Sequence, residues 1–140
     1  MPFIVNVPLS DVERGTHKVS EKMCLIQITD PLTEPPTPKH SFNRVSQYRF
    51  LDLEESSFPE LDDAKITYDV AEKIAEDLKW AMDNDHDVIV HCHAGRCRSG
   101  AVAEVGIILG FDDTGRERQP NLMVKHYLMR VLGMYYWSNE

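Results

Sequence analysis

The stretch VIVHCHAGRCRSG, residues 88–100, decides the fold of this chain. Three β-branched residues, 88–90, lead into His91 and Cys92, and such a run predicts a buried strand. A short loop with one glycine follows, and an apolar helical pattern begins at residues 98–100. The order of strand, tight loop and helix therefore predicts that Cys92 ends a buried strand beside a helix N-terminus.

The loop inside this stretch predicts an anion site. The amides of residues 93–98 are expected to point at one spot in front of the helix, where unpaired N–H groups and the helix dipole favour negative charge. Arg96 and Arg98 add guanidinium groups, and this positive environment favours the thiolate form of Cys92. One segment thus supplies a nucleophile and a cradle for an anion.

Strands and helices are expected to alternate along the rest of the chain. Apolar and β-branched runs predict strands over 3–7, 23–28, 48–53 and 88–90. Apolar residues at helical spacing predict helices over 66–82 and 99–109, another after Pro120, and a brief helix with a capping box of Ser10 and Glu13. The proline-rich segment 31–40 is expected to be a loop. This alternation is typical of a single α/β domain, with a mostly parallel central sheet flanked by helices.

Length and composition place the chain in a broad class. The 140 residues, 42% of them hydrophobic, are enough for one domain, residues 1–140, with its own core. No apolar run approaches the roughly 18 residues that a membrane helix needs. The first residues lack the features of a secretory signal, and three cysteines favour free thiols over a disulfide framework. We therefore expect a soluble cytoplasmic protein.

The net charge of −8 limits the possible partners. Nucleic acids and anionic membranes are bound mainly through basic faces, so neither is expected as a partner. Acidic residues gather at 52–55 and 60–63, whereas Arg96 and Arg98 lie inside the 93–98 loop. Any recognition of phosphate is therefore expected to be local to that loop.

The motif around Cys92 resembles the signature of the cysteine-dependent protein tyrosine phosphatases. In both, His-Cys is followed by five residues, here including Gly95, and then by Arg-Ser. Three further segments are similar to small bacterial and phage phosphatases of the dual-specificity type: CLIQITDP at 24–31, YRFLDL at 48–53 and QPNLMVKHYL at 119–128. The resemblance implies a protein tyrosine phosphatase-like fold. It also implies a monomeric phosphomonoester hydrolase without a cofactor, acting on a phosphorylated protein or a small phosphomonoester.

The resemblance also assigns roles to single residues. Cys92 would attack phosphorus and form a phosphocysteine intermediate, while Arg98 would bind two phosphate oxygens through its planar fork. Ser99 would donate a hydrogen bond to the sulfur when it leaves, and His91 would support the loop from behind. The residues expected to surround the phosphate are His93, Ala94, Gly95, Arg96, Cys97 and Arg98.

A general acid must protonate the leaving oxygen. The F-x-D-[IL] pattern of the related phosphatases places the acid at Asp52, in Phe50-Leu51-Asp52-Leu53. We favour Asp52 because it is expected to follow the end of a strand directly. The competing candidates are Glu54, Glu55, Asp62 and Asp63.

Two other functions remain open. His93 and Arg96 occupy positions where phosphatases of phosphoinositides and of phosphatidylglycerophosphate tend to have basic residues, so a phospholipid phosphatase is the second candidate. The third is a phosphate-binding module with weak catalysis or none. A metal site is not expected, because the donors near Cys92 lack the second pair that structural zinc usually takes.

The two remaining cysteines suggest a redox hypothesis. Cys97 lies five residues after Cys92, and its thiol could trap an oxidised Cys92 as a disulfide. Cys24, on its predicted strand, could do the same from behind.

Overall fold

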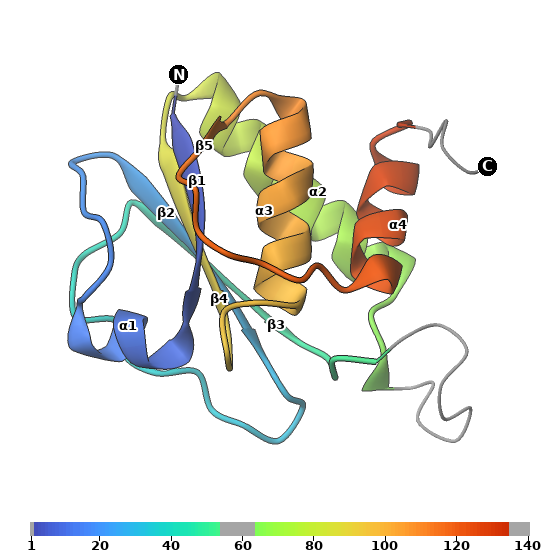
Figure 1. The fold of residues 1–140 in the computed structure, drawn as a ribbon, viewed down its shortest axis with the longest axis horizontal. Coiled ribbons are helices and arrows are strands. Elements are labelled where there is room, and N and C mark those ends of the chain that lie inside the picture. The colour runs from blue at the N-terminus through green and yellow to red at the C-terminus, as the bar shows by residue number, and fades with distance from the viewer. Residues whose placement is uncertain (1, 54–63, 135–140) are drawn as a thin grey trace.

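A parallel sheet forms the centre of the computed structural model (Figure 1), which describes residues 2–53 and 64–134. Within that part of the chain the sheet has five strands in the order β3-β2-β4-β1-β5, every neighbouring pair parallel. Their bounds are β1 Phe3–Pro8, β2 Met23–Thr29, β3 Arg44–Arg49, β4 Asp87–Cys92 and β5 Asp112–Asp113. Crossing between parallel strands requires long connections, and helices supply most of them.

Helices cover both faces of the sheet (Figure 1). The longer ones, α2, α3 and α4, lie together on one face, and the short α1 lies on the other. Their bounds are α1 Leu9–Arg14, α2 Tyr68–Asp83, α3 Arg98–Leu109 and α4 Leu122–Val131. The predicted α/β class, with a parallel sheet flanked by helices, is therefore confirmed.

The alternation of side chains along β4 decides where Cys92 points. Val88, Val90 and Cys92 belong to the core cluster under α2, α3 and α4, whereas Ile89 belongs to the cluster under α1. Since successive side chains of a strand face opposite sides, His91 points away from the face that holds Cys92. The thiol thus lies on the face of the sheet that α3 covers.

Helix α3 is buried over most of its length, as its apolar sequence predicts. Every residue from Arg98 to Ala103 is buried, and the helix ends at Gly110, whose φ is 124°. The last turn differs from the expectation, because Ile108 is 47% exposed. The N-terminal half is buried throughout and follows directly on the 93–98 loop, and Val105 and Gly106 are buried beyond it.

The strand predicted over 48–53 is wrong in its bounds. Strand β3 ends at Arg49, and it begins at Arg44 with inward positions that are polar. The sequence did not predict these bounds because the inward side chains of the strand are polar instead of apolar. Arg44 and Tyr48 donate hydrogen bonds to the buried carboxylate of Asp77 in α2, at 3.0 and 2.5 Å. A polar strand edge can face a helix when the helix supplies the acceptor.

One smaller expectation also fails, and one short strand was not predicted. The short helix α1 begins at Leu9, and no side chain caps it, so the predicted capping box of Ser10 and Glu13 does not form. Its start is set by a tertiary contact, in which the Leu9 N–H donates to the carbonyl of His93 at 3.2 Å. The two-residue strand β5 was not predicted, since it is too short to show any alternation.

None of the helices in the described part of the chain is both long enough and apolar enough to cross a membrane.

Candidate functional site

A cavity of about 370 Å³ opens where β4 meets α3. Cys92 lines it from the end of β4, although its residue is only 2% exposed, so the thiol sits deep in the cavity. The walls come from three segments: the turn after β2, the residues after β3 and the 93–98 loop. The lining residues are Asp30, Leu51, Asp52, Leu53, Cys92, His93, Ala94, Cys97 and Arg98.

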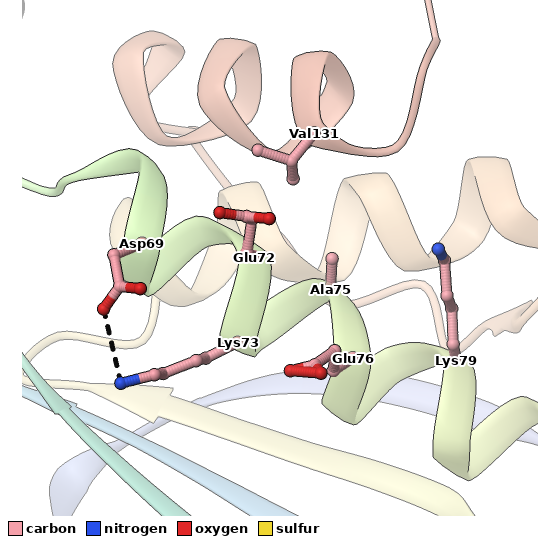
Figure 2. A pocket seen from close by; sticks show the side chains of 7 residues that line it. All are labelled: Asp69, Glu72, Lys73, Ala75, Glu76, Lys79 and Val131. Carbon is pink, nitrogen blue, oxygen red and sulfur yellow. Dashed lines mark ion pairs between the residues drawn. The ribbon is translucent and has the colours of Figure 1, made fainter.

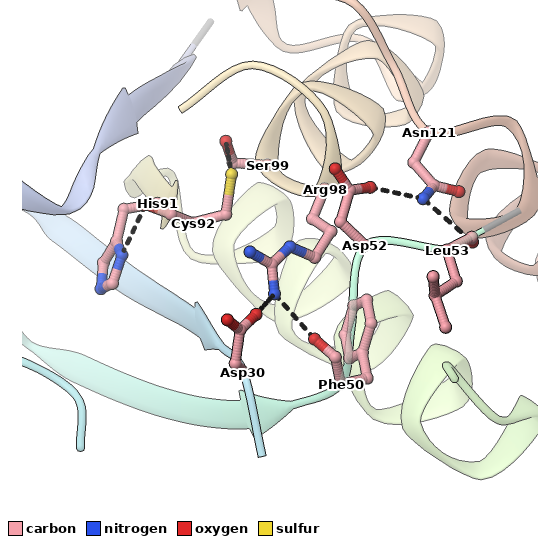
Figure 3. Close-up of polar contacts among 9 residues, drawn as sticks. All are labelled: Asp30, Phe50, Asp52, Leu53, His91, Cys92, Arg98, Ser99 and Asn121. Atoms are coloured by element: carbon pink, nitrogen blue, oxygen red, sulfur yellow. Dashed lines mark hydrogen bonds and ion pairs between the residues drawn. The ribbon is translucent and has the colours of Figure 1, made fainter. Parts of the chain in front are cut away.

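The Cys92 sulfur has one close polar neighbour among the described residues. Its Sγ lies 3.2 Å from Oγ of Ser99, which is in the first turn of α3 and fully buried (Figure 3). A serine hydroxyl can donate as well as accept. The hydroxyl is therefore placed to donate to a sulfur that carries negative charge.

The guanidinium of Arg98 is held at one end and open at the other. Its Nη1 donates to Oδ1 of Asp30 at 2.8 Å and to the carbonyl of Phe50 at 2.7 Å (Figure 3). The Arg98 residue is 5% exposed, and its Nε has no hydrogen-bond partner among the described residues. A buried donor without a partner is costly, so the free donors of this group suit an anion in the cavity.

Most carbonyl groups of the 93–98 loop accept hydrogen bonds from residues outside the loop. Those of residues 93, 95, 96 and 97 accept hydrogen bonds from Leu9, Asn6, Gln119 and Asn121, at 2.7–3.2 Å. In a trans peptide the N–H of the next residue points away from the preceding carbonyl, and none of the peptide bonds in residues 2–53 and 64–134 is cis. The amides of 94, 96, 97 and 98 therefore point away from these outer partners, as an anion cradle requires.

Gly95 allows this loop to lie directly against strand β1. Its φ is 74°, and a Cβ built on it would lie 2.3 Å from backbone atoms of Val7 and Pro8. The buried side chain of Asn6, on β1, donates to the Gly95 carbonyl at 2.7 Å and to the Glu117 carbonyl at 3.1 Å. The sequence analysis did not identify Asn6 as a site residue. An asparagine inside the apolar run FIVNV does, however, indicate a buried polar side chain that needs a hydrogen-bond partner.

The remaining loop side chains point to different places. His93 and Ala94 are exposed and line the cavity. Arg96 is not among the lining residues; its Nη2 pairs with Oε1 of Glu117 at 2.6 Å. The basic side chain that suggested a lipid substrate is therefore directed to a neighbouring loop.

His91 supports the loop as a neutral group. It is fully buried, and burial lowers the pKa of its imidazole to about 4. The hydrogen bond to the Cys92 carbonyl raises this pKa, and the positive charge of Arg98 lowers it, both by less than burial does. Its Nδ1 lies 3.4 Å from that carbonyl, so the neutral ring carries its proton there. No positive charge is therefore placed behind Cys92.

The structure brings Asp52 to the cavity by a different route from the predicted one. Asp52 lies three residues beyond the end of β3, and its exposed carboxyl lines the cavity with Cys92 and Arg98. Its Oδ1 accepts a hydrogen bond from Nδ2 of Asn121 at 2.6 Å (Figure 3). The competing acids, Glu54, Glu55, Asp62 and Asp63, lie outside the described residues.

Two further site residues were missed from the sequence. Asp30, which holds Arg98, lies in the Thr-Asp-Pro turn that the family resemblance had already singled out. Asn121, which holds Asp52, was recognised only as the start of a helix. Both act across more than sixty residues of sequence, and no local pattern reports such a contact.

The redox hypothesis fails for Cys24 and remains a prediction for Cys97. Cys24 pairs with Val88, four residues before Cys92 on β4, which places it about 13 Å away along the strand. Disulfides need Cα atoms within about 7 Å, and burial raises the pKa of the Cys24 thiol to about 11. Cys97 lines the same cavity as Cys92; burial, followed by the Asp52 carboxylate, raises the pKa of its thiol.

Metal donors do not converge in the described residues. No three histidine, cysteine, aspartate or glutamate side chains there form a group that could hold a metal ion.

A second hollow, of about 290 Å³, lies between α2 and α4 (Figure 2). It is lined by charged side chains that are exposed, among them Lys73, which pairs with Asp69 at 3.3 Å. Such pairs are mostly solvated and contribute little. A buried thiol and a buried guanidinium line instead the cavity at Cys92.

Comparisons with known proteins place this geometry in a fold. No protein-family model and no curated protein sequence matches the chain. Among solved structures, the human tyrosine phosphatase-like serine/threonine/tyrosine-interacting protein is similar, with a TM-score of 0.63 and 16% identity over 95% of this chain and 93% of that one. OH1 from the Orf virus, a tyrosine phosphatase with triple substrate specificity, gives a TM-score of 0.51 and 18% identity. The match covers 78% of this chain and 56% of the viral one.

The fold is therefore that of protein tyrosine phosphatase-like proteins, and this part of the sequence prediction is confirmed. At 16% and 18% identity the likeness concerns the fold. One of the two neighbours is described as a tyrosine phosphatase and the other as phosphatase-like. The activity of this chain must consequently be argued from its own site.

Replacing Gly95 by alanine tests the contact between the loop and β1. We expect a loss of about 3 kcal/mol in the free energy of unfolding, because the new Cβ overlaps the backbone of β1 and the residue is strained. We also expect the loop to lose its affinity for inorganic phosphate. Urea unfolding and phosphate titration measure the two effects.

The matched control is Gly115→Ala. Gly115 has nearly the same φ, 79°, but no described atom lies within 4 Å of the position that a Cβ would take there. Only the backbone strain of about 1–2 kcal/mol should appear, with phosphate affinity unchanged. Equal losses in the two variants would show that contact with β1 does not matter.

Peroxide treatment tests the role of Cys97. The oxidant converts the Cys92 thiolate to a sulfenic acid, and the Cys97 thiol then displaces water to form the disulfide. We expect an intact mass two hydrogens lower, with Cys92 and Cys97 joined in the thiol map. Cys24→Ala should leave the product unchanged, and Cys97→Ala should send Cys92 to higher acids. Formation of those acids in the wild type would contradict the hypothesis.

Proposed function

We propose that this protein is a phosphomonoester hydrolase of the protein tyrosine or dual-specificity type, with Cys92 as the nucleophile. The observation that carries the proposal is the arrangement around one cavity: a buried thiol, a guanidinium with free donors and inward-facing amides. Proteins catalyse phosphoryl transfer mainly by positioning the reactants and stabilising charge, and these groups can supply both.

The first step transfers the phosphoryl group to sulfur. The Cys92 thiolate attacks phosphorus from the floor of the cavity, and an S–P bond forms as the bond to the leaving oxygen breaks. Arg98 and the amides of the 93–98 loop bind the equatorial oxygens, where negative charge is spread in the transition state. Neutral Asp52 gives its proton to the leaving oxygen, so that an alcohol departs.

The second step returns the enzyme to its starting state. Asp52, now a carboxylate, takes a proton from water as the water oxygen attacks phosphorus. The S–P bond breaks and inorganic phosphate forms. Ser99, with its Oγ 3.2 Å from the sulfur, donates a hydrogen bond to the departing thiolate. Thiolate stabilisation matters more in this step, because sulfur is then the leaving group.

The walls of the cavity favour a phosphorylated protein as substrate. Leu51, Leu53 and Ala94 provide apolar surface around the phosphate position, which suits the ring of phosphotyrosine or a short phosphorylated side chain. The phospholipid alternative depended on basic residues at His93 and Arg96. Since Glu117 pairs with Arg96, and the net charge is −8, the support for an anionic lipid is weaker.

The wider setting follows from the same proposal. We infer one catalytic domain over residues 1–140, of the small bacterial or phage type, working as a monomer in the cytoplasm. Three free thiols, one of them the nucleophile, suit a reducing compartment.

A phosphatase panel tests the function and its nucleophile. The substrates are p-nitrophenyl phosphate, peptides carrying phosphotyrosine, phosphoserine or phosphothreonine, and phosphatidylglycerophosphate in vesicles. We expect turnover of the aryl phosphate and of the phosphotyrosine peptide. Cys92→Ser should abolish it, because the hydroxyl cannot replace the thiolate.

The panel also separates the alternatives. Preferred turnover of the lipid would favour the phospholipid phosphatase. Phosphotyrosine affinity without release of phosphate from any substrate would favour the binding module. Turnover that survives Cys92→Ser would refute the mechanism.

Replacing Asp52 by asparagine tests the general acid. Phenyl phosphate has a poor leaving group and needs protonation, whereas p-nitrophenyl phosphate needs little. We expect kcat to fall by about 100-fold for phenyl phosphate and by less than about tenfold for p-nitrophenyl phosphate. Asp69→Asn, in the hollow between α2 and α4, is the control and should leave both rates unchanged. Equal losses with the two substrates would exclude Asp52 as the acid.

A further inference from the structure

Asn121 uses every polar group it has, although it is only 3% exposed. Its Oδ1 accepts from the N–H of Val124 at 3.0 Å and so caps helix α4. Its Nδ2 donates to Oδ1 of Asp52 at 2.6 Å and to the carbonyl of Leu53 at 3.2 Å (Figure 3). The side chain therefore bridges the helix and the segment that carries the predicted acid.

The orientation of the amide follows from its partners. A backbone N–H can only donate, so the atom that faces Val124 must be the oxygen. The nitrogen is then left for Asp52 and Leu53, both of which offer oxygen acceptors. Its two hydrogens match these two acceptors, and this leaves no freedom to rotate the side chain.

The backbone of Asn121 makes a third link. Its N–H donates to the carbonyl of Cys97 at 3.0 Å, at the end of the 93–98 loop. One buried residue is thus bonded both to the loop that follows Cys92 and to the segment that carries Asp52. Asn121 is therefore one of the links that set the distance between nucleophile and acid, together with the hydrogen bond from Arg98 to the carbonyl of Phe50.

We propose that Asn121 is a positioning residue for Asp52, and this inference rests on the proposed function. Its N–H binds Oδ1 of the carboxyl group, so we assign the proton of the neutral acid to Oδ2, the oxygen that Asn121 does not bind. The bond to Leu53 fixes the backbone beside the acid. Asn121 does not touch the reacting atoms.

Asn121→Ser separates this role from helix capping. Serine is a good N-cap and still accepts from Val124, but it cannot reach Asp52 and Leu53 with two donors. We expect kcat for phenyl phosphate to fall by about tenfold, and for p-nitrophenyl phosphate by less than about threefold, because only the poor leaving group depends on the acid.

A matched control comes from the other capped helix. Thr67 caps α2 by accepting from Val70 at 3.2 Å and is exposed. Thr67→Ala lowers stability by about 1 kcal/mol without touching the cavity, so both rates should stay unchanged. A similar loss of phenyl phosphate turnover in this variant would mean that lost stability, not lost positioning, explains Asn121→Ser.

The double variant tests whether the effect passes through Asp52. If it does, adding Asn121→Ser to Asp52→Asn should cause no further loss with phenyl phosphate, since residues that act together are not additive. Independent, multiplied losses would overturn the proposal, and so would equal losses of Asn121→Ser with both leaving groups.

Hydrogen exchange tests the same contact without any turnover. Asn121→Ser should speed exchange in residues 50–53, and Thr67→Ala should not. Unchanged exchange there overturns the proposal for Asn121 alone. A wild-type chain with normal protection but no turnover of any substrate in the panel overturns the proposed function instead.

Discussion

The close approach of the 93–98 loop to strand β1 is the constraint on which the site depends. At Gly95 the loop lies so near the β1 backbone that no side chain fits between them. Asn6 then binds the Gly95 carbonyl from inside the strand. The carbonyl groups of the loop bind β1, the start of α1 and the segment before α4, so the amides face the opposite way. The cradle is a consequence of packing against these three segments.

The charged side chains around the site leave the guanidinium of Arg98 able to bind an anion in the cavity. The protein is acidic as a whole, and the loop arginines near its surface pair with acids, Arg96 with Glu117 and Arg118 with Asp113. Arg98 is also paired, with Asp30 through Nη1. An ion pair at one end fixes the plane of the guanidinium, and its Nε, which has no partner within the described part of the chain, can donate to an anion. His91 is neutral and adds no competing charge.

The fold and the activity rest on different residues. The parallel sheet and the helices over it are shared with a viral tyrosine phosphatase and with a human protein described as tyrosine phosphatase-like. A shared fold of this kind does not decide whether a chain turns over substrate. In this chain the case for catalysis depends on a thiol, a hydroxyl 3.2 Å away and a carboxyl at the same cavity. Asn121 binds both the carboxyl group of Asp52 and the 93–98 loop, although it is distant in sequence from Asp52 and lies outside the loop.

The sequence by itself determined the strand, loop and helix of residues 88–100 and the thiol that they carry. Apolar alternation and helical spacing report local burial, so β4, α3 and the thiol between them could be predicted without coordinates. Only the tertiary structure decided what holds this segment. Strand β3 was misplaced because its inward polar residues depend on Asp77 from α2, and Asp30, Asn6 and Asn121 each act on residues far away in the chain. Hydrogen bonds between distant segments leave no periodic trace, because their partners are chosen by the packing of the sheet and not by neighbours in sequence.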